Sequence, residues 1–245
     1  MARRRDAERG AAGLSEGVAE LLTRGAIEVK GRMPYSSNVT LLAELCLDGI
    51  TGLAIYKPER GERALWDFPS GLYKRELAAY HLSEALGWGL VPLTVRREGP
   101  YGEGSFQQFV AADFEQHYFT IVENPAHHDR LRRICLFDLL ANNADRKSGH
   151  CLLGQDGHVY AIDNGLCFHV DPKLRTVIWQ FAGETIPGSL LDDIRRLLDP
   201  GLPAALHDLL APDERRAVAA RAQVLVARKR FPTDRGGHRY PWPPV

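Results

Sequence analysis

Apolar and polar positions alternate over short stretches in the first part of the chain, up to about residue 110. This pattern, broken by Gly- and Pro-containing turns, predicts β-strands. Between two of the apolar runs, Asp48-Gly49 is typical of a two-residue hairpin turn. The expected strands cover residues 27–30, 39–47, 51–56, 93–97 and 105–110.

One helix is expected among these strands, at residues 73–86. Tyr73, Leu77 and Tyr80 fall on one helical stripe, and Gly87 follows as a stop signal.

The second part of the chain has mainly helical periodicity. The most regular stretch is residues 126–141, preceded by Pro125, and the last expected helix begins with Pro212 followed by Asp213-Glu214, which suit a helix start. Two short strands interrupt the pattern around a Gly-containing turn. The expected helices are residues 126–141, 189–198, 202–210 and 212–230, and the short strands are 151–153 and 159–162.

A strand-rich part followed by a helix-rich part predicts an α+β fold with two lobes rather than alternating α/β. We expect an N-terminal extension or helix, a β-rich lobe, a helical lobe and a Pro-rich tail. Their ranges are 1–24, 25–110, 111–230 and 231–245.

The composition is that of an ordinary globular protein, with 44% hydrophobic and 25% charged residues, which excludes general disorder. Lys and Arg number 31, as do Asp and Glu, so the formal net charge is +0 and nucleic acid is not an expected partner. The basic start lacks the apolar region of a signal peptide, and no membrane span is expected. The four cysteines form no CxxC pair, so a cytoplasmic location is expected.

Two charged residues in the first part stand where packing alone does not explain them. Lys57 ends the apolar strand TGLAIYK, where its side chain can point between the lobes. Glu76 flanks the apolar stripe of the following helix and is expected to face the sheet edge. Each residue alone is more typical of a solvated surface.

Two aspartates in the second part sharpen this pattern. Asp145 lies in a polar run directly after a hydrophobic helix, and Asp163 leaves a short apolar strand at Asp-Asn-Gly. The hairpin of short strands would bring these two turns together. Such a carboxylate pair suits a hard divalent cation and the orientation of a hydroxyl, as phosphoryl transfer requires. Asp-Asn-Gly is also an ordinary turn sequence.

The segments AIYKP, KRELAAYHLSEALG, FDLLANNADRKSGH and YAIDNG together resemble the kinase-like fold in its atypical form. The chain is similar to phosphatidylinositol 3-/4-kinase-related proteins, in particular an uncharacterised actinobacterial family described as phosphatidylinositol 3-/4-kinase-like. It resembles HipA-type kinases and secretory-pathway Golgi kinases more distantly. The resemblance covers roughly residues 25–200.

The resemblance implies a two-lobed kinase that uses ATP and Mg²⁺. It implies that Lys57, positioned by Glu76, binds the α and β phosphates, that Asp145 orients the attacking hydroxyl or accepts its proton, and that Asp163 holds the metal. It places the adenine at the hinge between lobes, here Gln108, Phe109 and Val110.

The chain departs from the kinase pattern in two places. The loop between the first two strands lacks GxGxxG, and Ser36, Ser37 and Asn38 are the candidate phosphate donors there. His150 stands where kinases usually carry a metal-binding Asn, five residues after Asp145. Because imidazole suits softer metals than Mg²⁺, His150 could bind Mn²⁺, contact phosphate or only pack.

The function expected from these residues is phosphoryl transfer from ATP to a hydroxyl acceptor, which could be a protein Ser or Thr, a small metabolite or a phosphoinositide. Three alternatives stay open. The chain could be a pseudokinase that binds a nucleotide or a partner without turnover, a nucleotidyltransferase on the same fold, or a scaffold that binds no nucleotide.

Overall fold

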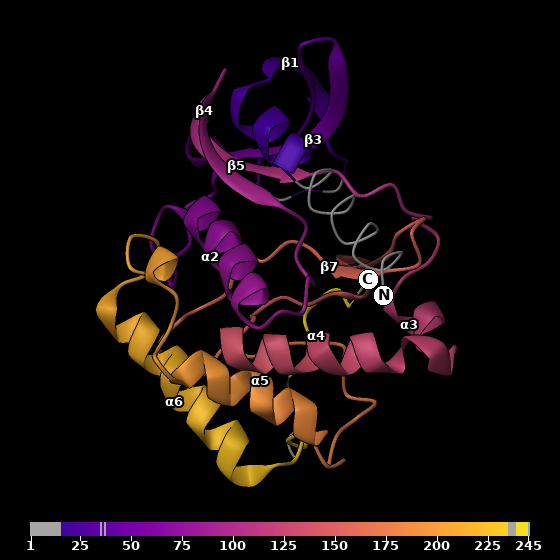
Figure 1. Ribbon diagram of the computed structural model, residues 1–245, viewed down its shortest axis with the longest axis vertical. Coiled ribbons are helices and arrows are strands. Elements are labelled where there is room, and N and C mark those ends of the chain that lie inside the picture. Colours follow the sequence, from indigo (N-terminus) through magenta and orange to yellow (C-terminus); the bar gives the residue numbers. More distant parts are fainter. Residues whose placement is uncertain (1–15, 35, 37, 235–238, 245) are drawn as a thin grey trace, which may run out of the picture. The chain divides into compact units, whose positions relative to one another are not determined.

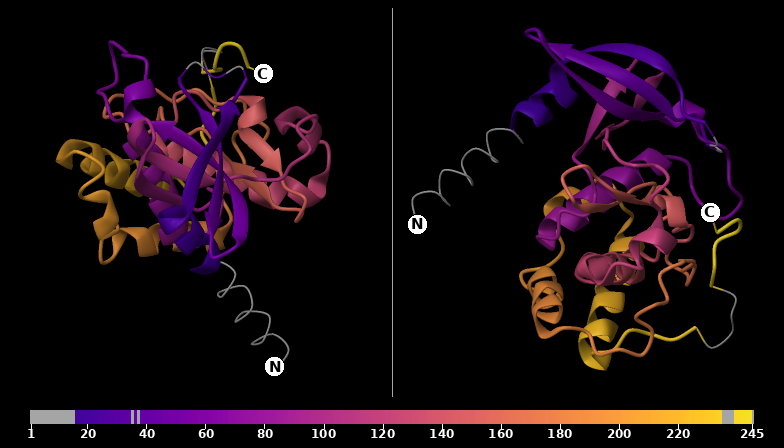
Figure 2. Two further views of the ribbon diagram at one scale, coloured as in Figure 1. Left: turned by 90° about the horizontal axis from the view of Figure 1, so that it is seen from above. Right: turned by 90° about the vertical axis from the view of Figure 1, so that its right-hand side faces the viewer.

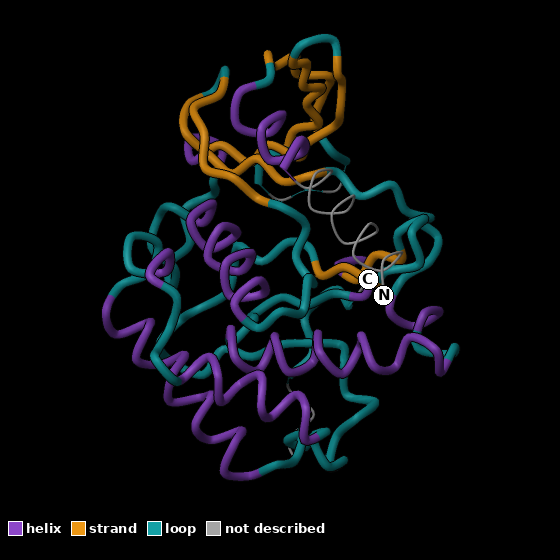
Figure 3. The backbone as a smooth tube through the Cα atoms, in the orientation of Figure 1, coloured by secondary structure: helices purple, strands orange, loops and turns teal. Residues whose placement is uncertain are grey.

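The structure is a computed structural model that describes residues 16–34, 36, 38–234 and 239–244. The chain folds into two compact units. The first contains the described residues up to Tyr73 together with 93–109, and the second contains residues 74–92 and the described residues from Val110 on. Figure 3 shows that the long strands belong to the first unit and most of the helices to the second.

The first unit is built on one antiparallel sheet of five strands in the order β1-β2-β3-β5-β4 (Figures 1 and 2). The strands are β1 (Ala26–Arg32), β2 (Leu41–Leu47), β3 (Ile50–Pro58), β4 (Thr94–Gly99) and β5 (Gly102–Gln108). All five expected strands are therefore confirmed. The expected strand at 105–110 begins earlier, at Gly102, and ends at Gln108.

The β2–β3 hairpin confirms the turn expected from Asp48-Gly49. Leu47 pairs with Ile50, so the loop has two residues, and both have positive φ, 50° at Asp48 and 80° at Gly49. These angles match the type I′ turn, whose twist follows that of the strands.

One face of this sheet carries the core of the first unit. Tyr56 and Phe106 stack across β3 and β5 with their ring centroids 4.2 Å apart. Leu21 and Leu22 of a helix formed by residues 16–24 cover the same cluster, which also contains Leu41, Ala43, Leu45 and Ala54.

The second unit is mainly helical. Its helices are α2 (Leu72–Ala85, in this unit from Lys74 on), α3 (Tyr118–Ile121), α4 (His128–Ala141), α5 (Gly188–Leu198) and α6 (Pro212–Arg228). A two-stranded hairpin of β6 (Cys151–Leu153) and β7 (Val159–Ala161) confirms the two short strands expected from the sequence. Short 3-10 turns lie at Glu59–Gly61, Pro125–His127, Ser148–His150 and Ala204–Leu206.

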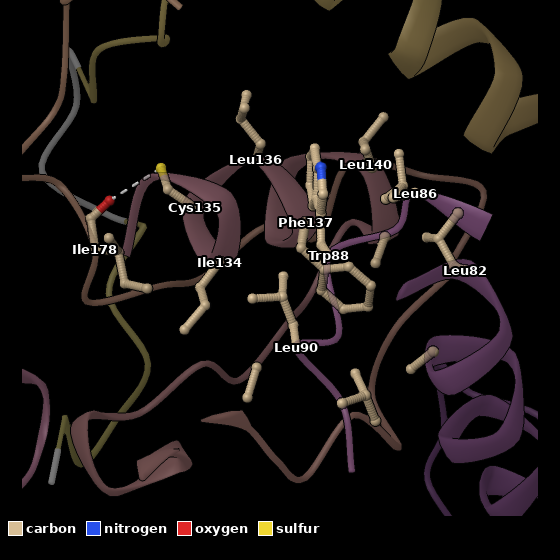
Figure 4. Packing of buried hydrophobic residues seen from close by; sticks show 14 of the residues in the cluster. Leu82, Leu86, Trp88, Leu90, Ile134, Cys135, Leu136, Phe137, Leu140 and Ile178 are labelled. Carbon is tan, nitrogen blue, oxygen red and sulfur yellow. Dashed lines mark hydrogen bonds between the residues drawn. The ribbon is translucent and has the colours of Figure 1, made fainter. Parts of the chain in front are cut away.

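Helix α4 is central to the core of this unit, and its buried side chains include Ile134, Phe137 and Leu140. Figure 4 shows these side chains with Trp88 and Leu90 from the segment after α2. The Trp88 indole N–H donates to Asp193 Oδ2 at 2.7 Å, which gives this buried ring a partner for its polar end.

The prediction of a helix at residues 202–210 is wrong. The structure has only the 3-10 turn Ala204–Leu206 there. Pro200, Gly201 and Pro203 precede the turn and Pro212 follows it, so few residues are left that could build an α-helical hydrogen-bond ladder. Helix α3 has no counterpart among the expected helices, because four residues carry too little periodicity to indicate one.

Within the described part of the chain, no helix combines the length and apolar character needed to cross a bilayer.

We expect Gly49→Ala to lower the free energy of unfolding by about 1 kcal/mol, because alanine is strained at a positive φ. Gly31→Ala is the matched control, since a Cβ there meets open space and the residue is not left-handed. Urea unfolding of both variants tests this. Equal losses at the two positions would contradict the turn.

Candidate functional site

Arg146 lies fully buried at the centre of the loop that follows α4. Its guanidinium contacts two segments of the second unit: Asp138 on α4 (Nη2 to Oδ1, 3.0 Å), and the turn after β7, through the carbonyl of Ile162 (2.6 Å) and the side-chain oxygen of Asn164 (2.7 Å). The planar, five-donor guanidinium suits such a junction. Arg146 is therefore internal and pairs with a carboxylate, and it is not a solvated surface residue.

Asp138 is equally buried and collects the other donors of this network. Besides Arg146, it accepts hydrogen bonds from Asn143 Nδ2 and Thr176 Oγ1, both at 3.1 Å. Burial raises the pKa of the Asp138 carboxyl, while Arg146 and these donors oppose that rise. We name Asp138, Asn143, Arg146, Asn164 and Thr176 the Arg146 network.

The Arg146 network holds Asp145 at its edge. The N–H of Asp145 donates to Asn143 Oδ1 at 2.9 Å, and its carboxylate lies 3.5 Å from the ammonium of Lys147. Burial raises the pKa of the Asp145 carboxyl to about 6, and nearby Asp163 adds to the rise while Lys147 opposes it. Asp145 and Asp163, which the sequence predicted to meet, are thus close enough to repel each other.

His150 joins this pair of aspartates. Its Nδ1 lies 2.9 Å from the carbonyl oxygen of Asp145, and its Nε2 lies 3.4 Å from Asp163 Oδ2. The backbone N–H of Lys147 also donates to Nδ1 at 3.3 Å. The contact with the Asp145 carbonyl requires a proton on Nδ1 and the contact with the Lys147 N–H requires a lone pair there, so these two contacts do not fix the tautomer. His150 thus links the backbone of the Asp145 loop to the Asp163 carboxylate.

Asp163 itself has a left-handed backbone, with φ 56°. A non-glycine residue adopts this conformation when its surroundings hold it there. The next residue, Asn164, is fully buried and donates its N–H to Glu76 Oε2 at 2.9 Å and its side-chain Nδ2 to Ala161 O at 3.2 Å. Its side-chain oxygen accepts from Arg146, so Asn164 holds the turn in place.

Glu76 is thus tied to the Asp163 turn within the second unit. Its neighbour on α2, Arg75, donates to the carbonyl of Cys167 at 2.6 Å and pairs with Glu214 on α6. Glu76 is only 2% exposed, which confirms that it does not face bulk water.

Lys57 lies on β3 in the first unit, pairs with Ser105 of β5 and is half-buried. Its position on the strand agrees with the sequence analysis. Its pairing with Glu76 stays a prediction.

The candidate phosphate loop also belongs to the first unit. Asn38 Oδ1 accepts the N–H of Arg63 at 2.8 Å, so this oxygen holds the loop in place. The Arg32 guanidinium donates to the carbonyls of Ser36 and Asn38 at 3.3 and 3.4 Å, which puts a cation at the loop that the sequence analysis did not single out. Ser37 lies outside the described residues.

At the expected hinge, the backbone N–H groups of Gln108 and Phe109 donate to Leu93 O at 2.8 Å and to Leu53 O at 3.1 Å. The boundary between the two compact units falls between Phe109 and Val110.

The donor set around Asp163 fits a divalent cation that also takes oxygens from a phosphate. In the described ranges, no three His, Cys, Asp or Glu side chains are grouped to hold a metal by themselves. Mg²⁺ and Mn²⁺ at phosphate-transfer sites need only one or two protein ligands, because the substrate supplies others. Asp163 provides a hard carboxylate and His150 an imidazole, a pair that favours Mn²⁺ over Mg²⁺.

Comparison with known proteins shows to which family the chain belongs. No model of a known protein family matches it. Protein Rv2133c of Mycobacterium tuberculosis is 41% identical over 261 residues, which cover 91% of this chain and 94% of that protein. The chain belongs to the same family as Rv2133c. The two proteins correspond over nearly their whole length.

Two solved structures resemble the chain. The hydra Fam20 structure with sugar has a TM-score of 0.52 at 15% identity and covers 85% of this chain and 87% of its own. The Helicobacter pylori proinflammatory kinase CtkA has a TM-score of 0.49 at 13% identity, over 85% of this chain and 94% of that one. The α+β kinase-like fold expected from the sequence is confirmed.

We expect Arg146→Met to lower the free energy of unfolding by about 3–5 kcal/mol, because it leaves Asp138 buried without its cation. The matched control is Arg196→Met, since Arg196 is 68% exposed in its pair with Asp193. This substitution should lower the free energy of unfolding by at most about 1 kcal/mol. Chemical denaturation compares the two variants. A loss at Arg146 no larger than at Arg196 would show that the network does not hold this unit together.

We expect Asp145→Asn to stabilise the fold above pH 6. The native pKa of Asp145, about 6, lies above the value of an unfolded Asp, so native stability falls as pH rises from about 4 to about 6. A neutral amide removes that loss, so the variant gains about 1–2 kcal/mol at pH 7 and nothing at pH 4.

Thermal unfolding between pH 4 and 8 measures this gain. Asp171→Asn, at a side chain that is 78% exposed, is the control and should change stability by less than about 0.5 kcal/mol. An Asp145→Asn variant that is less stable than the parent at pH 7 would contradict the statement that burial destabilises the charged carboxylate of Asp145.

Proposed function

We propose that the chain is an atypical ATP-dependent kinase that transfers the γ-phosphoryl group of ATP to a hydroxyl acceptor. The observation that supports this most is the gathering of Asp145, Asp163 and His150 at the edge of the Arg146 network. A buried ion pair that holds two repelling carboxylates side by side is costly, and such arrangements cluster at functional sites.

In this proposal Asp145 is the catalytic base. It orients the acceptor hydroxyl and takes its proton as the new P–O bond forms and the bond between the γ-phosphorus and the bridging oxygen breaks, releasing ADP. A carboxylate whose pKa is about 6 is deprotonated at pH 7 and is more basic than an ordinary Asp, which suits this role. Lys147, 3.5 Å from Asp145, supplies positive charge beside the reacting group.

Asp163 and His150 would hold the divalent cation. When bound, that cation neutralises charge on the phosphate oxygens. We assign Mn²⁺ or Mg²⁺ to this position, with the imidazole favouring Mn²⁺.

Residues of the first unit, together with Glu76 and Val110 of the second, would supply the remaining nucleotide contacts. Lys57 is proposed to bind the α and β phosphates with Glu76 as its partner, and the loop at Ser36, Ser37 and Asn38 to donate to phosphate. The backbone at Gln108, Phe109 and Val110 is proposed to meet the adenine.

The finer family assignment is also a proposal. The motifs AIYKP, DRKSGH and YAIDNG support a relation to the phosphatidylinositol 3-/4-kinase-like proteins. The acceptor classes compatible with the chemistry are a protein hydroxyl, a small metabolite and a phosphoinositide.

A pseudokinase is the second candidate, and His150 is the observation that favours it. Its Nδ1 is engaged with the Asp145 carbonyl, and neighbouring Asn164 is committed to Arg146, Ala161 and Glu76. The second metal ligand common in kinases then has no oxygen donor at these two positions. This candidate predicts nucleotide binding without turnover.

We expect Asp163→Ala to lower metal-dependent phosphate transfer from γ-labelled ATP at least about 10²-fold, because the cation loses its carboxylate. Lys57→Met should have a similar effect, and Asp171→Ala, a nearby exposed aspartate, should not. Transfer is measured with ATP labelled at the α or γ position, after circular dichroism confirms that each variant folds.

The labels separate the alternatives. Transfer of label from α-labelled ATP to an acceptor indicates nucleotidyl transfer. Thermal stabilisation by ATP without transfer of either label indicates a pseudokinase. Undiminished γ-transfer by a folded Asp163→Ala variant would contradict the assignment.

A further inference from the structure

Residues 239–244 lie against the loop that carries Asp145. Pro244 O accepts the N–H of Ser148 at 2.9 Å, and Arg239 O accepts the N–H of Thr176 at 2.9 Å. Ser148 and Thr176 are both buried. Residues 239–244 therefore contact both the loop that carries Asp145 and the segment that follows Asp163 (Figure 2, yellow near the label C).

The Thr176 contact is one main-chain hydrogen bond on the outer side of a short parallel bridge. Arg146 pairs with residues 175–177 from one side, donating its N–H to Arg175 O at 3.0 Å and accepting that of Val177 at 3.1 Å. The N–H of Thr176 then faces the opposite side, where Arg239 meets it. An edge of this kind pairs with any extended chain through main-chain atoms.

Most side chains of residues 239–244 are exposed. Pro241 is buried, but Trp242 is 88% exposed and Tyr240 47% exposed. The two main-chain contacts do not depend on the identity of the occupant. Another extended polypeptide could replace this segment at the same two donors.

Two polar groups on the contacted segments lack partners among the described residues. Ser148 Oγ and Trp179 Nε1 are buried and make no hydrogen bond there. Buried polar groups of native proteins are nearly always paired, and an unpaired one costs stability. Residues 239–244 thus accept hydrogen bonds from the main-chain N–H groups of Ser148 and Thr176. They do not provide partners for Ser148 Oγ and Trp179 Nε1.

We propose that the Ser148–Thr176 edge is the docking site of an extended polypeptide acceptor and that residues 239–244 occupy it as an intramolecular competitor. This inference rests on the proposed kinase function and narrows its acceptor to a protein segment. The tethered segment competes through its high effective concentration, despite few contacts.

The test uses the full chain with one substitution in the competing segment. Pro241→Asp places a charge at the buried proline and should release the segment, while Trp242→Ala, at an exposed side chain, should leave it docked. Hydrogen exchange followed by mass spectrometry should show faster exchange at Ser148 and Thr176 in Pro241→Asp only.

The free edge is probed with a fluorescein-labelled peptide of sequence Arg-Tyr-Pro-Trp-Pro-Pro. Its affinity for Pro241→Asp should exceed that for the parent and for Trp242→Ala by about tenfold, since the internal competitor is gone. Equal binding to all three proteins, or none to Pro241→Asp, would overturn the docking edge.

The acceptor class is tested with γ-labelled ATP, Mn²⁺ and either a Ser/Thr-containing peptide library or phosphatidylcholine vesicles containing phosphatidylinositol. Pro241→Asp should label the peptides about tenfold faster than the parent, in line with the gain in affinity. Labelling of the lipid in place of the peptides would overturn the polypeptide acceptor. Failure of the parent to bind ATP in a thermal-shift assay would instead refute the kinase function. The peptide-binding experiment does not depend on ATP, so it would still test whether the Ser148–Thr176 edge binds a polypeptide.

Discussion

The buried ion pair between Arg146 and Asp138 is the constraint on which the candidate site depends. Both side chains are fully buried, and a charge removed from water is tolerated only when its partner and its hydrogen bonds are complete. Completing them recruits Asn143, Thr176, Ile162 and Asn164. These residues come from the loop after α4, the turn after β7 and the segment beyond it, so satisfying one guanidinium brings together stretches that are distant along the chain.

The same geometry explains why the reactive groups lie where they do. Asp145 neighbours Arg146 and Asp163 neighbours Asn164, so each aspartate is carried at the rim of a rigid, buried centre. The rim is dry enough to raise the pKa of Asp145 yet leaves the Asp163 side chain 51% exposed. In the proposed function, a cation and a substrate would relieve the repulsion between these two carboxylates.

Much of this could be predicted from the sequence because it is local. The strands, the Asp48-Gly49 turn and the positions of Asp145 and Asp163 follow from short patterns. The burial of Arg146 could not be predicted, since a single Arg in a polar run looks like a surface residue and its partner Asp138 reads as one polar position on an apolar helix. The pairing of residues 239–244 with Ser148 and Thr176 depends on main-chain atoms, which no residue type specifies. The helix predicted at 202–210 is wrong because the prediction relied on the spacing of apolar residues and gave too little weight to the prolines in and around the segment.

In the proposed function, this rim binds the metal and the phosphates of a nucleotide. A crystal structure of the full chain with a non-hydrolysable ATP analogue and Mn²⁺, located by its anomalous scattering, tests this most directly. We expect a manganese peak bonded to the Asp163 carboxylate, with the nucleotide phosphates beside it and the Asp145 carboxylate facing the terminal phosphate. A nucleotide bound elsewhere on the chain, or a manganese peak that avoids Asp163, would contradict it.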